Sequence, residues 1–224
     1  MTTYLVTPQV QDGLAGPSLR QQTDRVIDEL ITSLHDPTLL TSEQRRGIIA
    51  RYSAVLEGNF IYWMTATYLS SMSEEAHPIL LDNLREEVGD CHPQMLRKFA
   101  IAAHAFPTDK DALDVHDDLT KVRLFLGRLG GVQNLLTMAF FESYIQRFMG
   151  YLAELARLQG STEMVYTDVH GVCDVAHSEG LFQATASEMV INPPDPAANL
   201  FEGVDLLRTL LQRINRIDGN PAAA

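Results

Sequence analysis

The sequence contains little cysteine, and this shortage excludes two classes of protein. Its 224 residues include two cysteines, Cys91 and Cys173, which do not form a C-x-x-C pair. Two cysteines without such a pair exclude a disulfide-rich scaffold and a zinc ribbon, and they are typical of proteins in a reducing compartment. We therefore expect a cytoplasmic protein.

Basic residues are also scarce. The chain has 17 Lys and Arg against 29 Asp and Glu, which gives a net charge of −12. A surface of this charge repels nucleic acid and anionic lipid, so we expect neither as a partner. No apolar run approaches the ~20 residues that a membrane-spanning helix needs. The first residues have neither the basic nor the apolar segment of a signal peptide.

Several common catalytic motifs are absent. The sequence contains no H-E-x-x-H, no G-x-S-x-G, no P-loop and no G-x-G-x-x-G. These absences argue against a zincin, an α/β-hydrolase and a nucleotide-binding enzyme. Ferritin-like sites need two E-x-x-H motifs. The one match here, Glu74-x-x-His77, is followed by Pro78 at an expected helix start.

Alternating strand patterns are absent as well, and nearly the whole chain has the helical period. The helix signals cover residues 18–35, 42–72, 74–90, 93–105, 109–129, 132–159, 162–190 and 198–217. With 46% hydrophobic residues, the chain can build one core. We predict an all-α domain of seven to eight helices at 18–217, preceded by an irregular arm at 1–17 and followed by a flexible tail at 218–224.

Three helix starts have recognisable capping residues. Thr41-x-x-Gln44 is a capping-box pattern, and Thr108 is placed to cap the helix that follows it. Ser161 or Thr162 is expected to cap the helix over 162–190.

The late helical segment contains the spacing H-x3-D-x2-H, formed by His170, Asp174 and His177. Since each helical residue advances by ~100°, the three side chains fall within a stripe of ~60°. Two imidazoles and one carboxylate suit a first-row transition metal. The alternative is a solvated polar face without a ligand.

Two glutamates interrupt apolar helical stripes. Glu142 has mainly apolar neighbours on its face, and Glu57 has the same pattern on an earlier helix. Burying a carboxylate costs several kcal/mol unless a cation or hydrogen-bond donors compensate. An arginine partner for Glu142 is the main alternative to a metal. For Glu57 the alternative is a kink at Gly58-Asn59 that turns it outward.

A further histidine follows an acidic run. His92 is followed on its helical face by Met95, Leu96 and Phe99, and the residues before it include Glu86. For His92, the alternative to a metal ligand is an ordinary core histidine. For Glu86, the alternative is a solvated acidic run at a helix end. The complete set of candidate metal ligands is Glu57, Glu86, His92, Glu142, His170, Asp174 and His177. Three histidines and four carboxylates exceed the needs of one metal, but they suit two iron ions; carboxylate-rich sites favour iron or manganese over zinc.

These motifs together resemble the haem-oxygenase-like diiron oxidases over residues 42–190. Four features match this family: the late H-x3-D-x2-H, a glutamate on the preceding helix (Glu142), an N-L-x-E-E-x-G run at 83–89 followed by His92, and an aromatic run at 59–63. Some members also use an early glutamate, here Glu57. The gap before His92 is one residue shorter than in the family, which leaves Glu86, Glu87 and Asp90 open as the ligand at that place.

The resemblance implies a seven-helix fold without haem, two Fe(II) ions (or Mn), O2 as cosubstrate and an electron donor. It implies oxidation of an unactivated C–H bond, by desaturation, hydroxylation, cyclisation or chain cleavage, in natural-product biosynthesis. We expect a small aliphatic amino acid as substrate, with Arg123 or Arg128 as its anchor. Fatty-acid oxidation and amine N-oxidation are the alternatives within the family.

Two other classes of function stay open. A metal-free thiaminase-like enzyme would use Cys91 or Cys173 as a nucleophile, with a glutamate base. A helical interaction protein without catalysis, for example a dimer, is the second. A homodimer is also left open for the diiron oxidase. Metal analysis separates both from the diiron oxidase.

Overall fold

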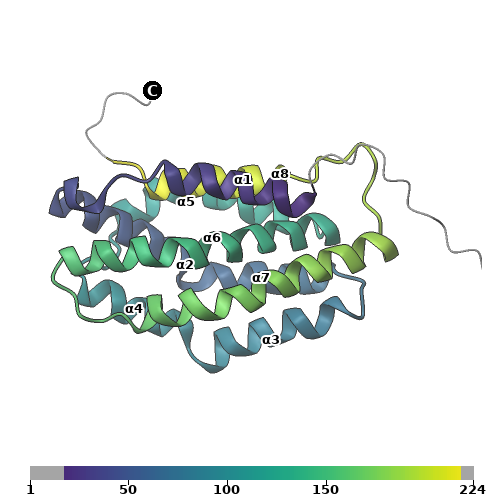
Figure 1. The fold of residues 1–224 in the computed structure, drawn as a ribbon, viewed down its shortest axis with the longest axis horizontal. Helices are drawn as coiled ribbons and strands as arrows, with labels where there is room; N and C mark the ends of the chain where they lie inside the picture. Colours follow the sequence, from purple (N-terminus) through teal and green to yellow (C-terminus); the bar gives the residue numbers. More distant parts are fainter. Residues whose placement is uncertain (1–17, 218–224) are drawn as a thin grey trace, which may run out of the picture.

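Helices form the whole of the architecture that the computed structural model describes, which comprises residues 18–217 except for the side chains of 172–175. Figure 1 shows them as a bundle elongated along one direction. The helices are α1 (Leu19–Thr32), the short 3-10 helix η1 (Pro37–Leu39), α2 (Ser42–Ser70), α3 (Ala76–Gly89), α4 (His92–Ala102), α5 (Asp109–Leu126), α6 (Gly131–Leu158), α7 (Val165–Ile191) and α8 (Glu202–Ile214).

The prediction of an all-α fold is therefore confirmed, and each predicted helix is present, with ends that differ from the predicted ones by at most four residues. The described part of the chain contains no strand. The predicted arm at 1–17 and tail at 218–224 lie outside the described residues. No described helix combines the length and the apolar character needed to cross a bilayer.

Local capping sets two of the predicted helix starts. The Thr41 hydroxyl accepts from the Gln44 N–H, and the Gln44 side chain accepts from the Thr41 N–H, which completes the capping box of α2. Thr108 caps α5 in the same way with Asp111. Both boxes satisfy N–H groups that the first helical turn leaves without partners.

The predicted N-cap of α7 at Ser161 or Thr162 is wrong. The helix begins at Val165, and its N-cap residue Met164 makes no side-chain capping bond. Ser161 accepts instead from the Glu163 N–H, and the Glu163 carboxylate accepts from the Val165 N–H. These local bonds favour a turn before the helix, because short polar side chains compete with helical hydrogen bonding.

The core is centred on α6, which lies between the α1–α8 side of the bundle and α7. Its buried side chains include Leu135, Phe140, Tyr144, Phe148 and Leu152, all with no exposed surface. Each such apolar side chain contributes about 1.5–3 kcal/mol on burial. Glu142, near the middle of α6, is 3% exposed and therefore faces other helices and not water.

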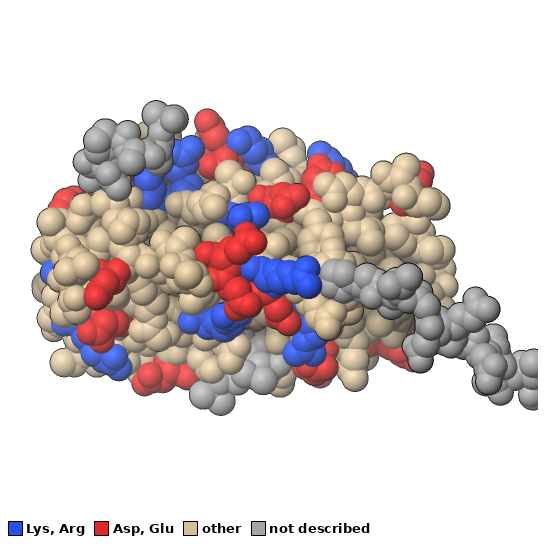
Figure 2. All heavy atoms as spheres, turned by 45° about the horizontal axis from the view of Figure 1, so that its top comes forward, with Lys and Arg blue, Asp and Glu red and all other residues tan. Residues whose placement is uncertain are grey.

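Acidic and basic side chains are mixed on the face over α1 and α8 (Figure 2). Arg208 of α8 pairs with Glu29 of α1 at 2.7 Å, and Arg147 of α6 pairs with Asp28 of α1 at 2.6 Å. The basic groups of this face are therefore distributed among acidic ones. The expectation that nucleic acid is not a partner stays a prediction.

The corner between α3 and α4 brings two potential ligand segments close together. Cys91 is the N-cap of α4 and has φ 58°, in the left-handed region that residues with a side chain rarely adopt. The chain therefore turns within the two residues between Gly89 and His92. This sharp turn lets Glu86 and Glu87 at the end of α3 lie near His92 at the start of α4.

Candidate metal centre

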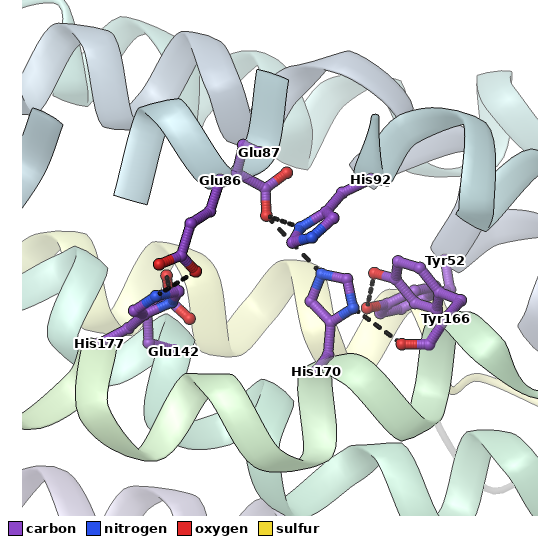
Figure 3. A network of polar contacts seen from close by, with 8 residues as sticks. All are labelled: Tyr52, Glu86, Glu87, His92, Glu142, Tyr166, His170 and His177. Carbon is purple, nitrogen blue, oxygen red and sulfur yellow. Dashed lines mark hydrogen bonds and ion pairs between the residues drawn. The ribbon is translucent and has the colours of Figure 1, made fainter. Parts of the chain in front are cut away.

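Three ligand-type side chains from three helices meet at this corner. Glu87 of α3, His92 of α4 and His170 of α7 each offer a ligand atom, and these atoms lie within 4.8 Å of one another. The Nδ1 of His92 lies 2.7 Å from the Glu87 Oε1, and the Nε2 of His170 lies 3.6 Å from the same oxygen. Figure 3 shows both rings directed at this carboxylate.

Burial separates this group from ordinary surface ion pairs. The exposed fractions are 9% for Glu87, 4% for His92 and 7% for His170. The two imidazole rings lie with their centroids 4.6 Å apart. The low exposure of His170 shows that this histidine does not lie on a solvated face.

A backbone bond orients His170. Its Nδ1 lies 2.8 Å from the carbonyl oxygen of Tyr166, one helical turn earlier. Since a carbonyl only accepts, Nδ1 carries a proton, and Nε2 is the nitrogen that faces Glu87 and that a metal would use once this nitrogen is deprotonated. Such an outer hydrogen bond typically holds a metal-binding histidine in one tautomer.

Electrostatics couple Glu87 to the two histidines. Burial by itself would raise the pKa of Glu87, but the hydrogen bonds from His170 and His92 and the charges of both rings outweigh it, so this pKa lies below its ordinary value. Burial would lower the pKa of His92, but the hydrogen bond to Glu87 and the nearby carboxylates raise it overall. The pair therefore favours a carboxylate beside an imidazolium.

A second group lies beside the first. The Nε2 of His177 lies 3.0 Å from Glu86, and its Nδ1 lies 4.0 Å from the Oε1 of Glu142. Glu142 is 3% exposed, at the middle of α6. Because Glu86 and Glu87 are consecutive, α3 contributes one carboxylate to each group, and both point toward α7 (Figure 3).

A cavity lies against the first group and reaches Glu142 of the second. Its lining contains Glu87, His92, His170 and Glu142, and its remaining wall is mostly apolar, with Leu56, Phe60, Ile61, Pro93, Leu96, Phe141, Ile145, Tyr52 and Tyr166. The space open to the centres of water molecules is about 20 Å³. One water needs ~10–15 Å³, so the cavity admits small species such as water, O2 or a metal ion.

The structure brings five of the seven predicted ligands together: Glu86, His92, Glu142, His170 and His177. Asp174 lies on α7 between two of them, but its side chain is outside the described residues. Glu57 does not line the cavity. Its carboxylate accepts from the Arg97 guanidinium, with Nε at 2.7 Å. Its side chain is partly buried on α2 and pairs there with Arg97 of α4.

The sequence allows Glu86, Glu87 or Asp90 beside His92, and in the structure Glu87 lies there. Asp90 is exposed and Glu86 faces His177. Two residues of this region were missed entirely: Tyr52 and Tyr166, whose hydroxyls meet in the cavity wall. Both are at apolar helical positions, so only their partnership in space distinguishes them from core residues.

The predicted substrate anchors do not lie at the cavity. Arg123 is exposed and lies over the Tyr62 ring at 5.2 Å, and Arg128 pairs with Glu202 at 2.7 Å. The thiaminase-like alternative required a cysteine near a glutamate base. Cys91 is exposed and does not line the cavity, while the side chain of Cys173 is not described.

Comparison with known families agrees with this geometry. The family model described as iron-containing redox enzyme, of the haem-oxygenase type, matches residues 50–210, which is most of the chain. The chain belongs to this family and is an iron-dependent oxidoreductase with a haem-oxygenase-like fold. No curated protein matches the chain.

The donor chemistry at the corner fits iron. Three carboxylates and three imidazoles gather in one mostly buried region, and oxygen and nitrogen ligands without thiolate suit iron better than zinc. None of the described residues that line the cavity is Lys or Arg. Several carboxylates in such a place are costly unless cations neutralise them.

Proposed function

We propose that the protein is a non-haem diiron oxidoreductase that uses O2. The observation that supports this most strongly is the arrangement of two Glu–His groups side by side, one at Glu87, His92 and His170, the other at Glu86, Glu142 and His177. Each group would hold one Fe(II), and Asp174 would be a further ligand from α7. Bound iron supplies the electrons and the coordination positions that O2 needs in order to react.

The residues of the chain have three tasks in this proposal. The Tyr166 carbonyl holds His170 with Nε2 available. Glu87 and His92 share a proton that metal binding releases, because a ligand must be deprotonated. The apolar wall, with Leu56, Phe141 and their neighbours, keeps water away from the reacting atoms.

We propose an unactivated C–H bond of an aliphatic substrate as the site of reaction. A small amino acid has two charged groups close to any carbon that reacts, and the described lining offers no Lys or Arg for its carboxylate. A fatty acid can leave its carboxylate at the mouth while the apolar chain enters. The wall therefore favours the fatty acid over the amino acid, and side chains must move to admit either.

Iron binding is the decisive test. Protein prepared without metal and titrated anaerobically with Fe(II) should bind two ions per chain, and His170→Ala should lower that stoichiometry. The matched control is His116→Ala, because His116 is exposed on α5 and away from both groups. Equal iron binding by the His170→Ala variant and the wild type would contradict the proposed site.

The substrate class is tested separately. Saturated fatty acids of graded length and aliphatic amino acids are added to the Fe(II) protein before O2, and the decay of any transient visible absorption is followed. Faster reaction with the fatty acids, and an oxidised fatty-acid product, support the preference argued here. Oxidation of amino acids alone would reverse it without removing the diiron assignment.

A further inference from the structure

Two buried tyrosines in the cavity wall are hydrogen bonded to each other. The hydroxyl of Tyr52 on α2 lies 2.8 Å from the hydroxyl of Tyr166 on α7. Their exposed fractions are 0% and 4%, and both side chains line the same cavity as Glu87 and His170. Each phenol can donate and accept, so the pair forms a direct O–H···O link. Neither belongs to the proposed ligand groups.

The pair is in contact with the proposed metal centre. The rings of Tyr166 and His170 lie with centroids 4.2 Å apart, and the Tyr166 carbonyl accepts from His170 (Figure 3). A row of rings continues from Tyr52 in the other direction. The ring centroids of Tyr52 and Phe148 lie 5.7 Å apart, and those of Phe148 and the half-buried Tyr151 lie 5.4 Å apart. Aromatic rings therefore extend from His170 toward the protein surface.

We propose that Tyr52 and Tyr166 form a hydrogen-atom relay that reduces oxidants formed in the cavity when O2 reacts without substrate. The inference rests on the proposed function, since it requires iron and O2 at the centre. A phenol yields an electron and a proton more readily than the hydrocarbon side chains of Leu56, Phe141 and Leu96 around it. The relay thus protects those side chains and the ligands from oxidation.

The transfer proceeds in balanced steps. The Tyr166 O–H bond breaks, and its electron and proton pass to an O2-derived one-electron oxidant, which is reduced. The Tyr52 O–H bond then breaks, and its hydrogen atom crosses the 2.8 Å link to re-form the Tyr166 O–H bond. This leaves the radical on Tyr52. An external one-electron reductant such as ascorbate returns the electron through Phe148 and Tyr151. The proton that ascorbate releases on oxidation passes through water and restores the Tyr52 O–H bond.

A purely structural hydrogen bond between the two hydroxyls would stabilise the core but form no radical. The discriminating measurement is therefore spectroscopic. Iron-loaded wild-type protein is exposed to O2 without substrate, frozen at successive times and examined by electron paramagnetic resonance. A tyrosyl radical is expected, and protein grown with ring-deuterated tyrosine should give a narrower signal, which identifies the radical without any substitution.

Variants then locate the radical. Tyr166→Phe should lose the signal, whereas Tyr52→Phe should keep a radical on Tyr166 that ascorbate reduces more slowly. Tyr144→Phe is the matched control, since Tyr144 is equally buried and its hydroxyl accepts from Asn215 at 3.2 Å, outside the pair. It should behave like the wild type.

A second measurement follows oxidative damage to the protein. After repeated exposure to O2 without substrate, peptide mass spectrometry should find more oxidised residues along the cavity, and less retained iron, in Tyr166→Phe than in Tyr144→Phe. Iron bound and O2 consumed, but with no tyrosyl radical and equal damage in both variants, would overturn the relay and leave the diiron proposal standing. A chain that binds no iron would remove both proposals.

Discussion

Glu87 and His92 are joined at 2.7 Å across the strained corner between α3 and α4. The left-handed backbone of Cys91 makes this contact possible, because it reverses the chain within two residues. Strained conformations of this kind persist where surrounding structure requires them. The corner thus has a physical role in presenting a carboxylate and an imidazole to α7.

Glu87 should be essential for tight iron binding. Glu87→Gln removes the charge that both histidines face, while the shape of the side chain is kept. We expect Fe(II) affinity to fall by about 10–100-fold or more, as for the loss of a partner in a metal site. Anaerobic Fe(II) titration measures this. Glu74→Gln, at an exposed position, is the control and should bind iron as the wild type does.

Glu57 should be dispensable for iron binding if its contact with Arg97 persists when the site is loaded. Its side chain is 27% exposed and its partner 55% exposed, so the pair is screened by water. Such pairs contribute about 0–1 kcal/mol. Glu57→Gln should therefore change neither iron stoichiometry nor stability much. A loss of one iron per chain would show instead that Glu57 leaves Arg97 and becomes a ligand, as the resemblance implied.

Glu188 should contribute strongly to stability although it lies away from the proposed ligands. This fully buried carboxylate of α7 accepts from the Ser71 hydroxyl and from the backbone N–H groups of Met72 and Ser73. Glu188→Ala leaves these donors without that acceptor, and we expect a loss of roughly 3–5 kcal/mol. Urea unfolding measures it. Glu179→Ala on the exposed side of α7 is the control and should have little effect.

The contribution of Asp118 should depend on pH. Burial would raise the pKa of this carboxyl, but the hydrogen bonds and charges of Lys121 and Arg213 outweigh it and lower the pKa below its ordinary value. A lowered folded-state pKa means stabilisation that is present above the unfolded-state pKa and is lost as the pH falls through the folded-state value.

Unfolding of Asp118→Asn and wild type, compared near neutral pH and in acid, tests this sign. The variant should be less stable near neutrality by about 1 kcal/mol, because both partners are partly exposed and screened. The difference should disappear in acid. A difference that grows as the pH falls would contradict the assignment of the ion pairs.

The helical periodicity of the sequence sufficed for most of the fold. The capping boxes at Thr41 and Thr108 are local, so their effect on α2 and α5 could be predicted from residues three apart. The start of α7 could not, since the turn over Ser161 and Glu163 uses hydrogen bonds that compete with capping. A local sequence pattern predicts a helix start well where the residues around it favour one arrangement of hydrogen bonds over all others.

The sequence by itself determined which residues share a helical face: the spacing of His170, Asp174 and His177, and the position of Glu142 within an apolar stripe. Only the tertiary structure decided what these faces meet. In the structure Glu87 lies beside His92, Glu57 pairs with Arg97, and the hydroxyls of Tyr52 and Tyr166 form a hydrogen bond. The reason is that helical periodicity orders side chains around one axis, whereas contacts between helices depend on how the axes pack and where the corners turn.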